Sequence, residues 1–391
     1  MKLKKYIYGV ALGALSLAYT SCYNADKEFP DYEGGTTAYF AYQYPVRTLI
    51  LGNDIYDNSL DNDHRCRIWS TMGGAYGGRD AVVDIKVDPT LCDNLWFVDE
   101  GGNPDHRVTP LPADYYTLQS SVIPYNGEPR GYVEVKFTDK FFNDPKSLEN
   151  NYVIPLVMTN VSGIDHILTG TPRVGTTPSR TNSEFWEVLP KDYVLYCVKY
   201  MNPWQAKYIR RGVDNVTENT DTENAVTTPV VRKDFSLVDT DLEHYKENPV
   251  NANDEVCAIT TKSMTEAIFP VSFKTSNGTL SCKLILTFDE NNKNKCTIDV
   301  DQEGKDAGIT ASGNGEFIAG GTAYDTYKDY RWGSMNGEAV NRDILRLDYK
   351  VDFTDQKVKV ATADTMVVQT RESNKKVFFT PKYDETYNPG N

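Results

Sequence analysis

A short stretch of the sequence collects the side chains that most often contact sugars. Residues 320–333 hold three tyrosines, one arginine and one tryptophan: Tyr324, Tyr327, Tyr330, Arg331 and Trp332. A sugar ring has apolar C–H faces, and a flat aromatic side chain covers such a face at a low cost in conformational entropy. The stretch is a candidate ligand-binding loop. The alternative interpretation is a loop at the end of a barrel that folds its rings onto its own domain.

A second aromatic candidate lies in the first quarter of the chain. Trp69 precedes the glycine-rich stretch 73–78, which contains Tyr76. Both side chains are candidate ligand contacts for the same physical reason. Paired glycines are also typical of a bulge at the edge of a strand, so a structural role is the alternative.

The sequence lacks the residue sets typical of catalytic centres. Glycoside hydrolysis needs two carboxyl groups at a fixed separation, and the acidic run of family-18 glycosidases (Asp-x-x-Asp-x-Asp-x-Glu) does not occur. Neither does a G-x-S-x-G nucleophile motif, and the four histidines form no His/Cys cluster. We expect a protein that is not an enzyme and that uses no cofactor and no metal ion.

Two acidic patterns partly match cation sites. Asp299, Asp301 and Glu303 have the spacing of half an EF-hand loop, but Thr310 stands at the twelfth position, where Glu is needed. Another run contains four aspartates: Asp54, Asp57, Asp61 and Asp63. We expect this run to be a solvated loop, with a bound cation as the alternative.

The net charge excludes one large class of partners. The chain has 391 residues, 41 basic and 55 acidic side chains, a formal net charge of −14 and no basic run. Nucleic-acid binding depends mainly on Lys and Arg contacts to phosphates, so we expect no nucleic-acid partner. The same charge repels anionic lipid headgroups and favours neutral ligands, of which glycans are the leading class.

The first residues are typical of an export signal. Three lysines at positions 2, 4 and 5 precede the apolar stretch Ile7–Ala18, which is too short to span a bilayer comfortably. Small residues then lead to Cys22, as at the cleavage site of a bacterial lipoprotein. We expect residues 1–21 to be the signal peptide and the lipid on Cys22 to be the membrane contact. An ordinary secretory cleavage that leaves Cys22 a thiol is the alternative.

Six further cysteines follow Cys22. They are Cys66, Cys92, Cys197, Cys257, Cys282 and Cys296. Six cysteines allow 15 pairings, but three fall in each half of the chain, and an odd number argues against complete pairing within each domain. We expect buried free thiols, because cysteine packs well as a small apolar side chain.

Both halves of the chain carry short segments with the two-residue alternation of β-strands, bounded by Gly, Pro, Asn or Asp. The clearest are 67–70, 81–87, 131–137, 152–158, 193–200, 280–287, 296–300 and 344–353. We predict an all-β protein: a tether over 22–35, an immunoglobulin-like β-sandwich over 36–201, and a C-terminal antiparallel β domain over 202–391. The second domain is either a lipocalin-like barrel or a second sandwich. In a barrel of that kind Trp204 and Arg371 would stack on each other, and the alternative is that the two residues are unrelated.

Four ordered motifs connect the first domain with a known family. They are Tyr44–Gly52, Leu111–Tyr116, Phe137–Phe142 and Tyr152–Leu156. This set resembles the immunoglobulin-like domain of unknown function in Bacteroidetes surface lipoproteins, which also precedes family-18 endo-β-N-acetylglucosaminidase modules. Residues 198–204 with Arg210, Arg211 and Gly212 resemble the start of a second domain that often follows it. Residues 24–28 resemble the surface-export signal of such lipoproteins.

The resemblance implies a role but supplies no binding residue. Such proteins are taken to be surface glycan-binding proteins that act beside outer-membrane glycan importers. We therefore expect a non-catalytic lipoprotein on the outer membrane, facing the exterior, that binds an oligo- or polysaccharide for uptake by an importer complex. One alternative is an adhesin or structural surface subunit that binds protein or host matrix. A second is an accessory module of a glycoside hydrolase system.

Overall fold

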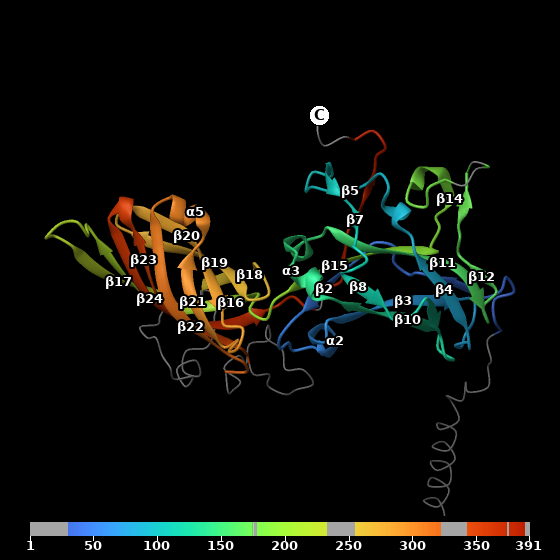
Figure 1. Ribbon diagram of the computed structural model, residues 1–391, viewed down its shortest axis with the longest axis horizontal. Coiled ribbons are helices and arrows are strands. Elements are labelled where there is room, and N and C mark those ends of the chain that lie inside the picture. The colour runs from blue at the N-terminus through green and yellow to red at the C-terminus, as the bar shows by residue number, and fades with distance from the viewer. Residues whose placement is uncertain are drawn as a thin grey trace, which may run out of the picture.

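Strands form nearly all of the regular structure in both halves of the chain. The computed structural model describes residues 30–173, 175, 178–232, 255–321, 342–373 and 375–387. They form a β-sandwich followed by a closed β-barrel, which lie side by side along the longest axis of the molecule (Figure 1). The predicted all-β class is confirmed, and the barrel replaces the alternative of a second sandwich. Within the described ranges, no helix is long and apolar enough to cross a membrane.

The sandwich consists of two mainly antiparallel sheets. The first has the order β12 (His166–Ile167), β1 (Thr37–Tyr39), β3 (Arg65–Gly73), β10 (Arg130–Phe137) and β8 (Tyr116–Leu118). The second has the order β25 (Val377–Phe378), β2 (Pro45–Ile50), β15 (Tyr193–Met201), β11 (Tyr152–Ser162), β4 (Val82–Val87) and β9 (Val122–Pro124), with β7 (Thr109–Pro110) also paired to β11.

Alternation along the strands builds the core between these sheets. On β3, the side chains of Cys66, Ile68 and Met72 point inward and are buried, while their neighbours point to solvent. Strand β11 is instead buried along its first seven residues, because both of its faces are covered. A second apolar cluster on its far side, which includes Val153 and Val157, packs against the small sheet of β5 (Leu95–Val98) and β6 (Pro104–Arg107).

The barrel closes through one long strand. Its eight strands are β16 (Ala206–Glu218), β18 (Glu255–Thr261), β19 (Glu266–Thr275), β20 (Gly278–Phe288), β21 (Lys295–Val300), β22 (Ile309–Ile318), β23 (Ile344–Phe353) and β24 (Val358–Thr370). Neighbours in this order pair, and β24 pairs back to β16 along almost its whole length. The hairpin strand β17 (Val226–Arg232) adds to the second half of β16. The pairing of β24 with β16 joins the two ends of the strand order and so closes the barrel.

Polar groups interrupt the apolar interior of the barrel. Arg210 is 1% exposed, and its guanidinium lies 2.8 Å from the carboxylate of Asp364 and donates to the hydroxyl of Tyr349 at 2.7 Å. The Tyr349 hydroxyl also donates to Asp364 at 3.0 Å. A buried ion costs several kcal/mol unless it is paired and hydrogen-bonded. The three side chains meet that condition together, and Asp364 helps to hold the pKa of Arg210 well above its usual value.

Trp204 closes one end of the barrel core. Its indole stacks on Phe288, with ring centroids 3.6 Å apart and an interplanar angle of 5°. The sequence suggests that Trp204 and Arg371 stack on each other. The structure gives the indole Phe288 as its stacking partner, and the guanidinium of Arg371 donates to four main-chain carbonyls, one of which belongs to Gln205.

Those four carbonyls make Arg371 the main polar link between the two domains. Its guanidinium donates to Leu51 at 2.9 Å and to Asn53 at 2.8 Å, both on the loop after β2. It also donates to Asn202 at 2.7 Å and to Gln205 at 3.2 Å, at the start of the barrel. Arg371 is only 9% exposed. The sandwich and the barrel are therefore joined by a buried, charge-assisted network rather than by a flexible link.

The chain returns to the sandwich after the barrel. Strand β25 pairs with β2, and β26 (Lys382–Tyr383) pairs with β5. Phe379 joins the apolar cluster beside β11, and the buried Trp96 donates to the carbonyl of Asp384 at 3.3 Å. Figure 1 shows this red segment running back to β5. The sequence prediction placed residues 375–387 in the second domain; strand pairing places them on the first, because β2 and β5 offer open edges.

The cysteines behave as small apolar side chains. All six that follow Cys22 are free, four of them fully buried and two half-buried. Burial raises the pKa of five of these thiols to about 12: Cys66, Cys92, Cys197, Cys282 and Cys296. The prediction of free thiols is confirmed for all six cysteines. The prediction that they are buried is confirmed for four of them, whereas Cys257 and Cys282 are half-buried.

Candidate ligand-binding face

The first sheet presents an outer face made by the outward positions of β3 and β10. The two strands are antiparallel neighbours, and their register places Tyr132 opposite Trp69 and Glu134 opposite Arg67. Directly opposite side chains on one face of a sheet lie within contact distance. The outward side chains of these two central strands are therefore held in a defined array by backbone pairing on both sides.

Two aromatic rings and two guanidinium groups form the middle of this array. The rings of Trp69 and Tyr132 lie 4.7 Å apart between centroids, tilted by 53°. The guanidinium of Arg130 lies 4.7 Å from the Trp69 ring, and that of Arg67 lies 4.3 Å from the Tyr132 ring. Trp69 is 42% exposed and Tyr132 is 36% exposed. We call these four residues the aromatic–arginine face.

Each cation over a ring contributes about 0.5–1 kcal/mol at an exposed site. The order along the face is Arg130, Trp69, Tyr132, Arg67, so a cation lies at each end of the ring pair. Such flanking restricts the rings to one geometry before a ligand arrives, and rigidity of this kind lowers the entropic cost of binding. The face combines apolar ring surface with hydrogen-bond donors beside it.

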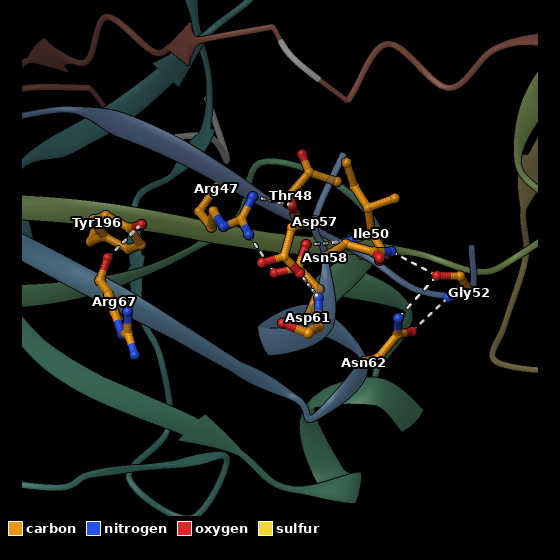
Figure 2. Close-up of polar contacts among 11 residues, drawn as sticks. Arg47, Thr48, Ile50, Gly52, Asp57, Asn58, Asp61, Asn62, Arg67 and Tyr196 are labelled. Atoms are coloured by element: carbon orange, nitrogen blue, oxygen red, sulfur yellow. Dashed lines mark hydrogen bonds and ion pairs between the residues drawn. The ribbon is translucent and has the colours of Figure 1, made fainter. Parts of the chain in front are cut away.

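A buried carboxylate holds the arginine side chains at the Arg67 end of the face. Glu134 is 8% exposed, and its two oxygens lie 2.8 Å from a terminal nitrogen of Arg65 and 3.5 Å from Nε of Arg67. The hydroxyl of Tyr196, from the second sheet, donates to the main-chain carbonyl of Arg67 at 3.3 Å (Figure 2). Arg67 is thus held from both its side chain and its backbone, which positions its guanidinium over Tyr132.

The ligand-binding residues predicted from the sequence lie in different places in the structure. Trp69 lies on the face, in contact with Tyr132. Tyr76 lies in the loop after β3 and is 74% exposed; its main-chain N–H lies 3.3 Å from the Asp31 carboxylate. The larger candidate set, Tyr324, Tyr327, Tyr330, Arg331 and Trp332, lies outside the described residues, as does Cys22. The two ends of the segment that holds this set meet, since the N–H of Gly320 donates to Asp343 at 2.7 Å.

The acidic run departs from the predicted solvated loop at Asp61, whereas Asp57 and Asp63 are exposed as predicted. Asp61, in the short helix α2 (Ser59–Asn62), is 1% exposed; it pairs with Arg47 and accepts the N–H of Ile50 at 2.9 Å (Figure 2). Burial raises the pKa of this carboxyl despite the opposing effect of Arg47. Asn62 of the same helix accepts the N–H of Gly52 at 2.8 Å. The helix therefore holds the loop after β2, whose carbonyls at Leu51 and Asn53 accept hydrogen bonds from Arg371.

The second acidic pattern is a helix cap. Asp301 caps α5 (Gln302–Asp306) by accepting the N–H of Gly304 at 2.9 Å. Asp299 pairs with Lys305 at 2.6 Å, and Glu303 pairs with Lys283 at 2.9 Å. Among the described residues, no group of three or more potential metal ligands comes together.

A groove on the barrel is a second candidate for a ligand-binding site among the described residues. The groove of about 570 Å³ is lined by hydroxyl, amide, lysine and small apolar side chains from five strands, among them Asn215, Thr227, Ser312, Lys350 and Ala361. None of its lining residues is aromatic. Because sugar recognition relies on ring stacking in addition to hydrogen bonds, the aromatic–arginine face fits a sugar ligand better.

Sequence reasoning missed three of the four residues of the face. Tyr132 stands in the predicted segment 131–137, whose alternation already marks it as an outward position, and Arg130 directly precedes this segment. The missing information was the register between two strands that are distant in the sequence, since only the register brings Tyr132 beside Trp69. Once two outward-facing strands are predicted to pair, an aromatic residue on each is a signal that a search could use.

Comparisons with known proteins find matches to both domains of the chain. A model for a domain of unknown function (DUF5627) matches residues 203–372, and a second model, described as a "-like, N-terminal domain", matches residues 32–165. The crystal structure of a Bacteroides ovatus protein of unknown function is 37% identical, with a TM-score of 0.72, over 91% of this chain and 100% of that one. A comparison with curated proteins gives no match.

Two further solved structures are much less similar. One is another Bacteroides ovatus protein of unknown function, at 11% identity and a TM-score of 0.36, covering 88% of this chain and 99% of that one. The other is described as an auxiliary nutrient binding protein from Bacteroides thetaiotaomicron, at 9% identity and a TM-score of 0.35, covering 83% and 90%.

The fold and the two domain matches define a two-domain protein of the Bacteroidetes type, with a β-sandwich followed by a barrel of unknown function. The chain belongs to the same family as the Bacteroides ovatus protein that is 37% identical to it.

Proposed function

We propose that this protein is a non-catalytic, lipid-anchored protein of the outer membrane that faces the exterior and binds a glycan for uptake by an outer-membrane importer complex. The observation that carries the proposal is the contact between Trp69 and Tyr132 on the exposed outer face of a sheet. Single exposed aromatic residues are common on protein surfaces and need no explanation. A pair in contact, flanked by two cations, is a rigid apolar platform of the kind that a sugar ring can cover.

The shape of the face sets the expected affinity. An open face with two rings buries far less of a ligand than an enclosed pocket does. We expect a dissociation constant for one short oligosaccharide near ~1 mM, which corresponds to about −4 kcal/mol. Many copies anchored on one surface would bind a long polysaccharide much more tightly, because each later contact is intramolecular. A polymeric ligand suits this face better than a single sugar does.

The test is binding of the purified protein to a broad panel of immobilised polysaccharides. Trp69→Ala and Tyr132→Ala should each weaken binding at least tenfold, as is usual for central aromatic contacts. Phe185→Ala is the matched control, because Phe185 is an aromatic residue of the same domain with 43% exposure that lies away from the face. Trp332→Ala tests the candidate from the sequence in the same experiment. Circular dichroism checks that each variant is folded.

The outcomes separate the site from the role. If Trp69→Ala and Tyr132→Ala bind as well as the parent, the face is not the binding site. If only Trp332→Ala loses binding, the site lies in the segment that the sequence indicated. A panel without a single bound glycan would refute the role itself, and capture of a protein ligand would favour the adhesin alternative.

The anchor has its own test. Cys22→Ser removes the thiol that would carry the lipid and should move the protein from the membrane fraction to the soluble fraction. One acyl chain gives only marginal membrane binding, so a multiply acylated cysteine is needed for stable anchoring. Continued membrane association of Cys22→Ser, with unchanged extraction by detergent, would contradict the proposed anchor.

A further inference from the structure

The aromatic–arginine face has a charge opposite to that of the chain as a whole. The chain carries a net charge of −14. The outward positions of β3 and β10 carry four basic side chains, Arg65, Arg67, Arg130 and Lys136, and a single acidic one, Glu134. A random placement of side chains from this composition would favour acidic residues. The excess of cations on two adjacent strands is therefore a local feature of this face.

The nearby carboxylates do not neutralise the whole face. Glu134 pairs with both Arg65 and Arg67, and Asp63, which precedes β3, also pairs with Arg65 at 2.5 Å, so these four side chains balance in charge. Among the residues that the structure describes, neither Arg130 nor Lys136 forms an ion pair, and the contact of Arg130 is with the ring of Trp69. Both side chains are exposed. They are available to an anion that approaches from solvent.

We propose that this face selects glycans that carry oxyanions, either the carboxylates of uronic acids or sulfate esters. This inference rests on the proposed glycan-binding function and narrows its ligand class. Carboxylate and sulfate ester share the chemistry that a guanidinium recognises: neighbouring oxygens that share one negative charge, two of which can accept parallel N–H bonds. A polysaccharide with such groups would place a sugar ring on Trp69 and Tyr132 and its charged substituent beside Arg130.

The position of Arg130 supports this division of roles. A guanidinium that lies over a ring uses its flat face for the ring, while its N–H groups point outward in the plane of the group. The N–H edge of Arg130 is therefore free for a ligand that lies on the same ring system. Lys136 adds a second charge further along β10, with Tyr132 and Glu134 between them. Charges spaced along a strand suit a polymer with repeated charges better than a single small anion.

The overall negative charge does not oppose this selection at close range. At physiological ionic strength, charges further apart than about 8 Å are largely screened from one another. Acidic residues that lie further than this from Arg130 therefore have little effect on its ligand, whereas a bound oxyanion would touch Arg130 directly. The preference for neutral ligands that the net charge suggests is therefore reversed at this face.

The experiment compares charged polysaccharides with matched neutral forms, using the full chain. Polygalacturonate is compared with its fully methyl-esterified form, and a sulfated galactan with its desulfated form. We expect the charged member of at least one pair to bind at least tenfold more tightly than its neutral form, and its binding to weaken as salt rises from 50 to 500 mM. The pair that shows the difference identifies the source of the oxyanion as carboxylate or sulfate.

Variants link the preference to the face. Arg130→Gln should weaken binding of the charged form about fivefold, with little effect on the neutral form, and Arg130→Lys should restore part of the loss. Arg107→Gln is the matched control, since Arg107 also lies over a tryptophan, at 4.5 Å from the Trp96 ring, but in the small β5–β6 sheet. Poly-glutamate tests whether negative charge alone is enough for binding.

Each result decides the question. A charge preference that falls about fivefold in Arg130→Gln and is kept in Arg107→Gln supports the inference. Equal, salt-insensitive binding of charged and neutral forms that depends on Trp69 would overturn it and leave the proposed function standing. Binding of poly-glutamate as tight as that of the polysaccharide would overturn it as well, because the sugar would then play no part. Failure of every glycan to bind would overturn the proposed function with it.

Discussion

Replacement of Arg371 should uncouple the sandwich from the barrel. The change Arg371→Met keeps the length and apolar stem of the side chain and removes all of its donors. Two of the four lost bonds reach Leu51 and Asn53 in the sandwich, and two reach Asn202 and Gln205 at the start of the barrel. A hydrogen bond from a charged donor contributes about 1.5–3 kcal/mol when buried.

The magnitude follows from the bonds that cross the boundary. If water replaces the donor at some of these carbonyls, we expect the two bonds to the sandwich to account for a loss of about 3 kcal/mol in coupling free energy. At a urea dependence of about 2 kcal/mol per molar, this lowers the midpoint of the less stable domain by about 1.5 M. Arg371→Lys should lie between the two, since an ammonium group keeps the charge but cannot match the planar fork.

The assay is urea unfolding followed by hydrogen exchange and mass spectrometry, which reports β15 and β20 separately. The parent should lose protection in both strands at one midpoint, and Arg371→Met at two midpoints. Lys375→Met is the control, because Lys375 pairs with Glu372 at the surface and lies four residues away. A single transition in Arg371→Met within 0.3 M of the parent would refute this account of the junction.

Three further predictions concern titratable groups and the tail. At pH 8 the four buried thiols, each with a pKa of about 12, should react with iodoacetamide about a thousandfold more slowly than in the urea-unfolded chain, because the thiolate fraction falls tenfold per pKa unit; fast labelling of Cys66 in the folded protein would contradict this. Asp165 accepts two bonds from Thr36, which lower its pKa, so its contribution to stability should be present above the unfolded value of about 3.9 and lost as pH falls through the folded value; in Asp165→Asn the melting temperature should depend less on pH between 5 and 3. Phe379→Ala should destabilise the sandwich by about 3 kcal/mol, because it leaves a cavity beside Phe97; unchanged thermal unfolding would show that the tail only rests on the surface.

Local patterns were enough to predict the fold class and many strands. Segment 344–353 alternates along most of its length, because it has one apolar face in the barrel core and one face toward solvent. Segment 280–287 alternates as well, apart from the buried Ile285. Strand β16 is not among the segments that alternation predicts most clearly. Its interior positions include Arg210 and Asp214, which are buried but charged, so the alternation of hydrophobicity is broken where polar partners lie inside the barrel.

Contacts between residues that are far apart in the sequence could not be predicted from local patterns. The aspartate run reads as a solvated loop because nothing near it in sequence indicates that Arg47 pairs with Asp61 across a turn. The same holds for Tyr132, whose neighbour Trp69 comes from another strand. The short strands β25 and β26 carry almost no pattern of their own and are fixed by the edges that receive them. In each of these three cases the partner from elsewhere in the chain, rather than the local composition, determines the structure.

The return of residues 375–387 to the sandwich makes the first domain discontinuous, with the barrel as an insertion within it. Trp96 donates to Asp384 across 288 positions of the sequence. A ribosome or a secretion channel delivers the chain from its amino end, so the edges of β2 and β5 must wait for the entire barrel before they can be covered. A fragment cut after residue 201 would expose the cluster around Phe97, and a chimera that exchanges the barrel must carry the matching tail.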